Sequence, residues 1–239
     1  MQSLIARING YVALEDQEFA SLRQASAERV RKSRGATLVA AGEPLAHVFV
    51  LSKGWAIRYR TLPDGRRQIV NVMLPGDCFD LQALIAAKSD HAVEALTNVE
   101  LLRMHTEDFL AAVTASARLA TAFWWAAVQE ESILREQIVR LGRRSGRERL
   151  AHMLLELRRR LIQAGLDVGD TLSLPMSRDV LADLLGLSSV HVSRSIAALR
   201  QAGLIRTTNG TIQLLDVDRL AEVAQFDPTY LHTAKLARS

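Results

Sequence analysis

The residues best suited to recognition chemistry lie between Ser188 and Ala197, on what their spacing predicts to be one helix. The apolar residues Val192, Ile196 and Leu199 recur at i, i+4 and i+7, which defines a buried face. The opposite face carries mostly small side chains around one long cation, Arg194. A guanidinium can donate two hydrogen bonds to a guanine edge, and small neighbours let a helix enter a major groove. The candidate DNA contacts are Ser188, Ser189, Val190, His191, Ser193, Arg194 and Ala197.

A second predicted helix comes directly before this one and positions it. Ser177 can cap its start, and Gly186 breaks it. Ser188 can then cap the second helix, which ends at Gly203. The apolar residues of the first helix lie at helical spacing, and they are Val180, Leu181, Leu184 and Leu185. Two short helices joined by so tight a turn predict a helix-turn-helix.

Short strands are expected on both sides of this motif. Residues 172–175 read as a brief strand, and an Asn209-Gly210 turn between alternating strands predicts a hairpin over 204–214. An amphipathic helix from Arg147 to Ala164 precedes them, with the run Arg158–Arg160 either touching phosphate or facing solvent. The sequence therefore predicts a winged helix-turn-helix domain over residues 143–225, followed by a tail over 226–239.

The formal net charge of +4 is confined to the C-terminal part of the chain. Residues 1–142 hold 16 basic and 16 acidic side chains, whereas residues 143–239 hold 14 and 10. A basic surplus beside the predicted helix-turn-helix suits a polyanionic partner. The one cysteine, Cys78, excludes an internal disulfide and an all-cysteine iron–sulfur or zinc site within one chain. Its type suits a small buried side chain.

The N-terminal part is expected to carry an antiparallel sheet. Residues 1–34 read as helical, ending in the basic run Arg29–Arg34. From Ala36 to Met104, strand-like runs alternate with turns at intervals of roughly ten residues, a spacing typical of a β-sandwich or roll. We therefore expect a β-roll sensory domain over residues 1–106.

One long helix is predicted over residues 107–142, ending at a flexible basic junction over 142–146. Its residues Trp124, Ala127, Glu131, Leu134, Ile138 and Leu141 are separated by steps of three and four, which is a heptad seam. The seam predicts that two chains pair along it, and the alternative is a helix packed within its own chain. Glu131 either tunes that pairing or lies at its solvent edge.

No membrane or export segment is predicted. The apolar stretch from Leu110 to Val128 has Arg118 at its middle, which favours a packed helix over a bilayer span. Arg7 and Asn9 interrupt the only apolar run near the start of the chain. We expect a cytoplasmic protein.

The order of these parts resembles the CRP/FNR family of bacterial transcription regulators. The most specific matches are Gly42-Glu43, Gly54, Leu74–Asp77, Leu185–Leu187 and Val192–Arg194. The resemblance implies an α+β fold with an N-terminal antiparallel β-roll like a cyclic-nucleotide-binding domain, a dimerisation helix and a C-terminal winged helix-turn-helix. It implies a homodimer that regulates transcription on a pseudo-palindromic site in double-stranded DNA and contacts RNA polymerase.

The resemblance also assigns roles within the predicted recognition helix. Arg194 matches the family's base-contacting arginine, and Ser193 matches the serine of the FNR branch. Val190 replaces the glutamate that better-known members carry, so a different half-site sequence is expected, with Val190 suited to a thymine methyl group. His191 either binds phosphate or lies on the helix flank.

The identity of a ligand stays unknown at this stage. Cyclic AMP is disfavoured, because the matching segments 79–82 and 88–91 contain no arginine, and Asp80 and Asp90 would repel a phosphate. An iron–sulfur cluster is disfavoured because the cysteine cluster is missing. Haem stays open, since His47, His91 and His105 lie in or near the roll and one imidazole can suffice.

Two classes of function follow from these features. The first is a dimeric, sequence-specific transcription regulator. The second is a small-molecule- or haem-binding sensor module whose helix-turn-helix is architectural or contacts proteins. An enzyme is not expected, because the sequence has no phosphate-binding glycine loop, no H-E-x-x-H pair and no serine elbow.

Overall fold

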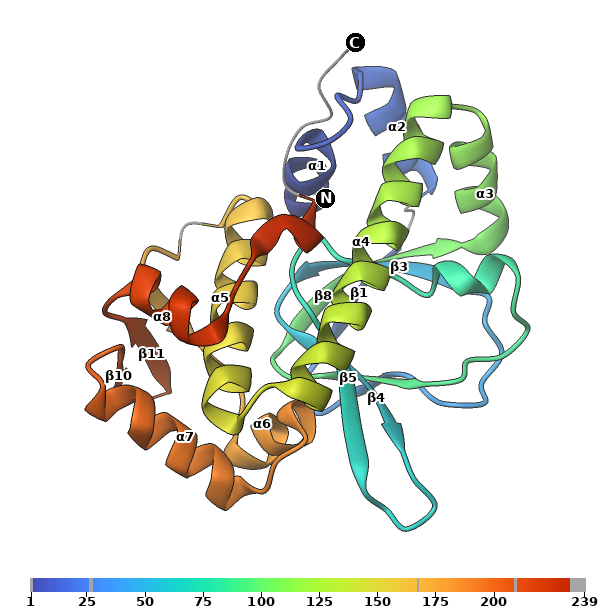
Figure 1. Ribbon diagram of the computed structural model, residues 1–239. Coiled ribbons are helices and arrows are strands. Elements are labelled where there is room, and N and C mark those ends of the chain that lie inside the picture. Colours follow the sequence, from blue (N-terminus) through green and yellow to red (C-terminus); the bar gives the residue numbers. More distant parts are fainter. Residues whose placement is uncertain (1, 26–27, 167, 209, 233–239) are drawn as a thin grey trace.

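The computed structural model describes residues 2–25, 28–166, 168–208 and 210–232 (Figure 1). The N-terminal elements are α1 (Gln2–Asn9), α2 (Asp16–Ala25), β1 (Glu28–Lys32), β2 (Thr37–Val39), β3 (His47–Lys53), β4 (Ala56–Thr61), β5 (Arg67–Met73), β6 (Cys78–Phe79), η1 (Leu81–Leu84), β7 (Ala92–Ala95) and β8 (Val99–His105). The C-terminal elements are α3 (Thr106–Thr114), α4 (Ala117–Arg143), α5 (Gly146–Gln163), β9 (Thr171–Ser173), α6 (Arg178–Leu185), α7 (Ser189–Gln201), β10 (Ile205–Thr208), β11 (Thr211–Leu214), α8 (Val217–Ala224) and η2 (Pro228–Leu231).

The predicted β-roll is present as two antiparallel sheets. One has the strand order β1-β8-β3-β6 and the other β2-β7-β4-β5. The apolar residues of alternating strand positions form a core that includes Leu51, Phe79 and Leu101. Gly54 occupies the β3–β4 turn at φ 86°, where a Cβ would lie 2.3 Å from the Asn98 carbonyl oxygen. Only glycine fits that turn, which explains its place in the family pattern.

The helical prediction for residues 1–34 is wrong at its C-terminal end. The basic run forms strand β1, which pairs antiparallel with β8 so that Val30 lies opposite Leu101. Arg29 and Arg31 point to solvent, while Val30 is half-buried against the roll core. Pairing with an existing sheet edge outweighs the helix propensity of the arginines.

The single helix predicted over residues 107–142 is also wrong, because the chain breaks into α3 and α4. Ser116 adopts an extended conformation, and its Oγ accepts a hydrogen bond of 3.2 Å from the Leu119 amide. The break lets α3 lie beside α4 (Figure 1). The rings of Phe109 and Phe123 meet edge to face between the two helices, with their centroids 4.8 Å apart. Burial of both rings in one core favours the break although neither proline nor glycine is present.

The predicted junction at 142–146 is shorter than expected. Gly142 and Arg143 belong to α4, so Arg144 and Ser145 alone separate α4 from α5. Ser145 and Glu148 form a capping box that starts α5, and Arg144 donates to the Ala224 carbonyl oxygen at 3.1 Å. These bonds hold the junction in place, contrary to the expected flexibility.

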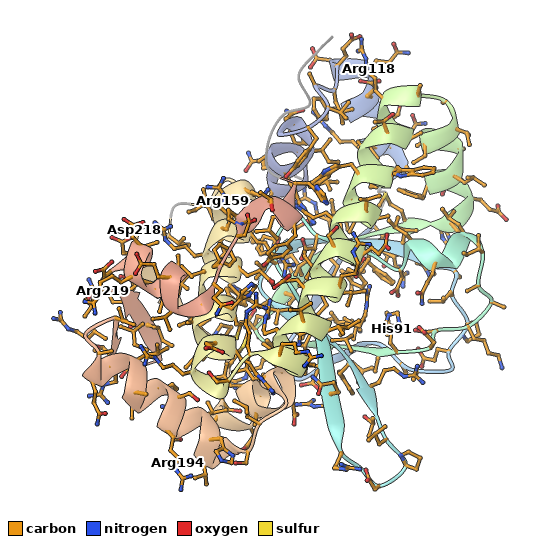
Figure 2. The ribbon with its side chains drawn as sticks, in the orientation of Figure 1. His91, Arg118, Arg159, Arg194, Asp218 and Arg219 are labelled. Atoms are coloured by element: carbon orange, nitrogen blue, oxygen red, sulfur yellow. The ribbon has the colours of Figure 1, made fainter. Side chains whose placement is uncertain are left out.

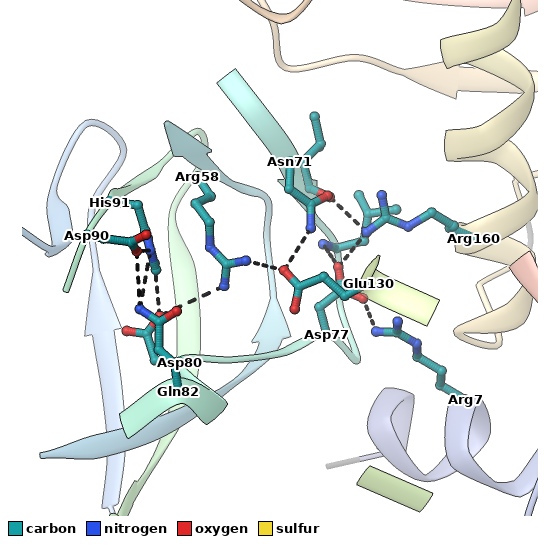
Figure 3. A network of polar contacts seen from close by, with 12 residues as sticks. Arg7, Arg58, Asn71, Asp77, Asp80, Gln82, Asp90, His91, Glu130 and Arg160 are labelled. Carbon is teal, nitrogen blue, oxygen red and sulfur yellow. Dashed lines mark hydrogen bonds and ion pairs between the residues drawn. The ribbon is translucent and has the colours of Figure 1, made fainter. Parts of the chain in front are cut away.

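The roll and the C-terminal domain share one core. Ile57, Ile69 and Val72 of the roll belong to the same apolar cluster as Leu154 of α5 and Leu185 of α6. A buried ion pair of 2.7 Å joins Arg160 of α5 to Asp77 in the roll, and Arg7 of α1 also pairs with Asp77 (Figure 3). The C-terminal domain therefore packs directly on the roll of its own chain.

The predicted wing is present in the C-terminal part, and the segment that follows it packs against α4. Strands β10, β11 and β9 form one antiparallel sheet, while Asn209 of the predicted turn lies outside the described residues. In the tail predicted over 226–239, Leu231 is fully buried and its carbonyl oxygen accepts a hydrogen bond from Gln129 of α4. Residues 233–239 lie outside the described part. Among the described helices, none has the length and apolarity of a bilayer span.

Candidate nucleic-acid interface

The helix-turn-helix forms as its caps predict. The Ser177 hydroxyl accepts a 3.2 Å hydrogen bond from the Val180 amide at the start of α6. Gly186 ends α6 in the left-handed region at φ 60°, where a residue with a Cβ is strained. Ser188 then caps α7 by accepting a 3.3 Å hydrogen bond from the His191 amide. Three residues thus set the turn between the helices.

Helix α7 separates a buried face from an exposed one. Val192, Ile196 and Leu199 are buried against α5 and α6, as their spacing predicts. The side chain of Arg194 points away from the body of the protein (Figure 2). Of the predicted contacts, Ser189 is half-buried and the others are exposed: Ser188, Val190, His191, Ser193, Arg194 and Ala197.

Hydrogen bonds within the chain already occupy several polar groups on this face of α7. Ser189 donates to the Asp179 carboxylate at 2.5 Å, and Ser193 donates to the Ser189 carbonyl oxygen at 3.0 Å. The Ser188 hydroxyl lies 2.9 Å from Nδ1 of His191. Arg194 has no side-chain partner among the described residues. Its guanidinium is therefore free to hydrogen-bond a ligand.

Two further arginines border this face, and the sequence reasoning did not single them out. Arg178 is exposed in the first turn of α6, which the Asp179–Ser189 bond holds beside the first turn of α7. Arg206 is exposed on β10 of the wing. A cation in a first helical turn and a cation at an outward strand position are the signals that mark them. Both suit contacts to phosphate.

A second cluster of charged residues lies inside the roll, at the segments matched to the cyclic nucleotide site (Figure 3). Asp80 is buried at φ 61°, with its Oδ1 3.1 Å from Nε2 of His91. Nδ1 of His91 lies 2.8 Å from Oδ1 of Asp90. An ionised carboxylate only accepts hydrogen bonds, so both contacts are hydrogen bonds when both ring nitrogens carry protons.

Although segments 79–82 and 88–91 contain no arginine, an arginine from another strand reaches this cluster. Arg58 of β4 lies 3.9 Å from Oδ1 of Asp80 and forms an ion pair with Glu130 of α4. Asn71 also donates to Glu130, at 3.3 Å. Asp80 and Glu130 are thus both paired with Arg58, and Glu130 ties the cluster to α4.

The structure also places the cysteine and the two other histidines that were considered as ligands in the roll. Cys78 is buried, and burial raises the pKa of its thiol well above the usual range. The rings of His47 and His105 lie 4.5 Å apart on paired strands, and burial lowers the pKa of His47. Within the described ranges, no three His, Cys, Asp or Glu side chains gather as a metal site would require.

Comparison with known proteins shows where this architecture belongs. A family model described as a Crp-like helix-turn-helix domain matches residues 148–223, and a cyclic nucleotide-binding domain model matches residues 29–116. The nitrogen fixation regulation protein FixK of Bradyrhizobium diazoefficiens is 34% identical over 212 residues, which are 89% of this chain and 86% of that protein. The chain belongs to the CRP/FNR family.

Other members support the same assignment. The transcriptional activatory protein AadR of Rhodopseudomonas palustris is 31% identical over 83% of this CRP/FNR chain and 82% of its own. The structure of FixK2 from Bradyrhizobium japonicum matches with a TM-score of 0.75 and 28% identity over 82% of this chain and 96% of that one. The chain is thus a DNA-binding transcription regulator and not an enzyme. The matches do not support the alternative of an architectural helix-turn-helix.

In this CRP/FNR regulator, α4 presents three faces. Leu119, Phe123 and Ile133 are offset from the seam and are buried toward the roll. Gln129 and Ser132 are buried on a second face under the C-terminal segment. The third face is the predicted seam, which has no buried residue: Trp124, Ala127, Glu131 and Ile138 are exposed, and Leu134 and Leu141 are half-buried.

The seam is strongly apolar at two of its positions. Trp124 is 76% exposed and Ile138 is 71% exposed, which is unusual for side chains of this size on a folded chain. Glu131 forms an ion pair with Arg135 of the same helix at the solvent edge. Leu141 differs from the other seam residues because it lies close to Gly186. Its Cδ2 is 3.1 Å from the position that a Cβ on Gly186 would occupy. Leu141 therefore contacts the helix-turn-helix turn.

Proposed function

We propose that this CRP/FNR regulator acts as a homodimer on a pseudo-palindromic site in double-stranded DNA of the cytoplasm. The proposal rests on the exposed apolar face of α4 together with Arg194 on α7, which has no partner in the described part of the chain. Pairing of two chains along Trp124, Ala127, Glu131, Leu134, Ile138 and Leu141 removes that face from water. Two recognition helices then reach successive major grooves, about 34 Å apart.

Each recognition helix reads one half-site in this proposal. Arg194 donates to the O6 and N7 atoms of a guanine, and Val190, 60% exposed, packs against a thymine methyl group. Ser188, Ser189, His191, Ser193 and Ala197 line the same face, and the small serine and alanine side chains allow close approach. Arg178 and Arg206 bind phosphates that flank the half-site. By the family resemblance, the bound dimer contacts RNA polymerase.

The roll interior supports a sensory domain that does not hold a cyclic nucleotide phosphate. Asp80 already faces His91 and Arg58, and Arg58 already pairs with Glu130. An entering phosphate would have to break these contacts and lie beside the buried carboxylate of Asp80. Any effector of this protein therefore has a different chemistry or acts at another place.

The test is selection of DNA by the purified full-length protein from a random-sequence duplex library. The proposal predicts enriched sequences with two inverted half-sites and, by native mass spectrometry, two chains on each duplex. Enriched sequences without an inverted repeat, or one chain per duplex, would contradict it.

A further inference from the structure

The glycine cap at the C-terminal end of α6 satisfies only one of the last carbonyl groups of the helix. The last carbonyl groups of a helix have no partner within it, and that end carries partial negative charge. The amide of Leu187 satisfies one of these groups by donating to the Ala182 carbonyl oxygen at 3.1 Å. The last turn of α6 contains no basic residue, and Asp183 adds a further negative charge. The carbonyl groups of residues 183–185 need donors from elsewhere.

Three side chains from three different elements supply those donors. Gln68 of β5 donates to the Asp183 carbonyl oxygen at 2.7 Å. Gln137 of α4 donates to the Leu184 carbonyl oxygen at 2.9 Å, and Arg149 of α5 donates to the Leu185 carbonyl oxygen at 2.9 Å. The roll, the seam helix and the first helix of the reading domain thus meet at one helix end.

The charge of Asp183 is balanced from the roll as well. Nε of Arg67 on β5 lies 2.8 Å from Oδ2 of Asp183, and Arg67 also pairs with Glu94 of β7 at 3.2 Å. Neighbouring residues of one strand therefore hold both the backbone and the side chain of Asp183. Since only residues 186–188 separate α6 from α7, the place of this helix end sets the place of the first turn of α7.

We propose that Gln68 and Gln137 are positioning residues, which fix the recognition helix relative to the seam of α4 and so set the half-site spacing that the dimer accepts. The proposal rests on the proposed function, since it requires a dimer on two half-sites. Gln137 links the reading unit to the seam helix, and Gln68 links it to the roll. Neither side chain belongs to the exposed face of α7, so neither contributes to base preference.

The test compares DNA affinities of the wild type and the Gln68→Ala/Gln137→Ala variant. The probes are the duplex that the wild type selects from a random library, the same duplex with one base pair inserted between half-sites, and a single half-site. One inserted base pair moves a half-site by about 3.4 Å along the duplex. We expect the insertion to weaken wild-type binding about tenfold or more and variant binding less than about threefold.

The single half-site separates positioning from general weakening. We expect both proteins to bind it within about twofold, because the Arg194 face is unchanged. A merely structural loss would lower affinity for all duplexes by the same factor and leave the spacing ratio intact. Gln163→Ala is the control, since the Gln163 amide donates to the Tyr11 hydroxyl at 2.6 Å and has no bond to α6. It should keep the wild-type spacing ratio.

The outcomes separate this proposal from the proposed function. A wild type that selects no inverted repeat overturns both. A wild type that selects one, with a folded double variant that keeps the tenfold spacing ratio, overturns the positioning role alone. The single variant Gln68→Ala is measured in parallel, because its half-buried side chain makes loss of the fold a small risk. An unchanged spacing ratio in that variant excludes the role of Gln68.

Discussion

The recognition helix and the roll interior use similar charged residues in opposite ways. On α7, Arg194 is exposed and has no side-chain partner among the described residues. In the roll, the Arg58 side chain is only 12% exposed and is paired with Glu130 and Asp80. A free cation on an outer face can bind a polyanion, whereas a cation paired inside the chain holds elements together.

The difference teaches that residue type alone does not identify a ligand site. Both regions also contain a histidine: His191 lies on the outer face, while His91 lies between two carboxylates. What decides availability is whether another element covers the group. Helix α4 covers the roll cluster through Glu130, and no described element covers α7 on its outer side. Five predictions test this contrast between the exposed face of α7 and the covered roll cluster. They are ordered from the largest expected effect to the smallest.

The variant Arg194→Ala should abolish specific DNA binding. A bidentate guanine contact contributes about 1–3 kcal/mol, and a dimer loses two of them. Fluorescence anisotropy with the selected duplex should show affinity falling to that for unrelated DNA, with weak, salt-sensitive binding retained. The matched control is Arg219→Ala, which removes an exposed arginine from α8 instead. Unchanged half-site preference in Arg194→Ala would place base reading elsewhere.

The variant Ile138→Asp should separate the dimer. The symmetric seam then buries two like charges without partners, which we expect to raise the dimer dissociation constant about a hundredfold or more. Sedimentation velocity measures the change. Leu110→Asp is the control, because Leu110 is a half-exposed apolar residue of α3 outside the seam. A dimer that tolerates Ile138→Asp as well as Leu110→Asp would show that α4 pairs through another face.

The variant Arg58→Met should destabilise the fold and leave base preference unchanged. It leaves Asp80 and Glu130 without the cation between them, which should lower the free energy of unfolding by about 1.5–3 kcal/mol. Urea unfolding measures the loss, and anisotropy on mutated half-sites measures the preference. A changed half-site preference would mean that the roll cluster takes part in reading, which would break the contrast.

Acid should destabilise the protein through His152. Burial first, and then Arg140 and Arg144, lowers the pKa of His152 to about 2, although a Glu136 oxygen lies 3.1 Å from Nε2. In the unfolded chain the pKa of His152 is near 6.5. Between about pH 2 and pH 6.5, the ring therefore binds a proton in the unfolded state but not in the folded state. Stability is therefore complete above about pH 6.5 and falls by about 1.4 kcal/mol per unit below it.

The measurement for His152 is urea unfolding at pH 7 and pH 5. The histidine should account for about 2 kcal/mol of the difference, and His152→Gln should remove that share. Equal pH dependence in His152→Gln and the wild type would show that the ring is not held neutral.

Cyclic AMP should have no measurable effect. Because His91 and Arg58 already lie against the Asp80 carboxylate, millimolar cyclic AMP should leave the thermal unfolding temperature unchanged. Differential scanning fluorimetry tests this. An upward shift in the wild type would mean that the cluster opens for an anion, and the contrast between the two regions would fail.

Local features of the sequence predicted the helix-turn-helix well. Ser177, Gly186 and Ser188 act through neighbours within a few residues, so their roles follow from spacing alone. The buried face of α7 followed from its period for the same reason. The roll was predicted from its turns, where Gly54 and Gly76 take positive φ values.

Features that depend on distant partners could not be predicted. Strand β1 exists because the edge of β8 accepts it, and the break at Ser116 exists because Phe109 and Phe123 share one core. The pairing of Arg58 with Glu130 joins residues 72 positions apart. No local pattern carries such information. The same holds for Gln68 and Gln137, whose amides matter only because α6 ends beside them.

The most direct test of the central claim is hydroxyl-radical footprinting of the wild-type protein on the duplex that it selects. A dimer that reads DNA with two copies of α7 predicts two protected segments, related by two-fold symmetry and centred about one helical turn apart. A single protected segment, or uniform weak protection along the duplex, would contradict the claim.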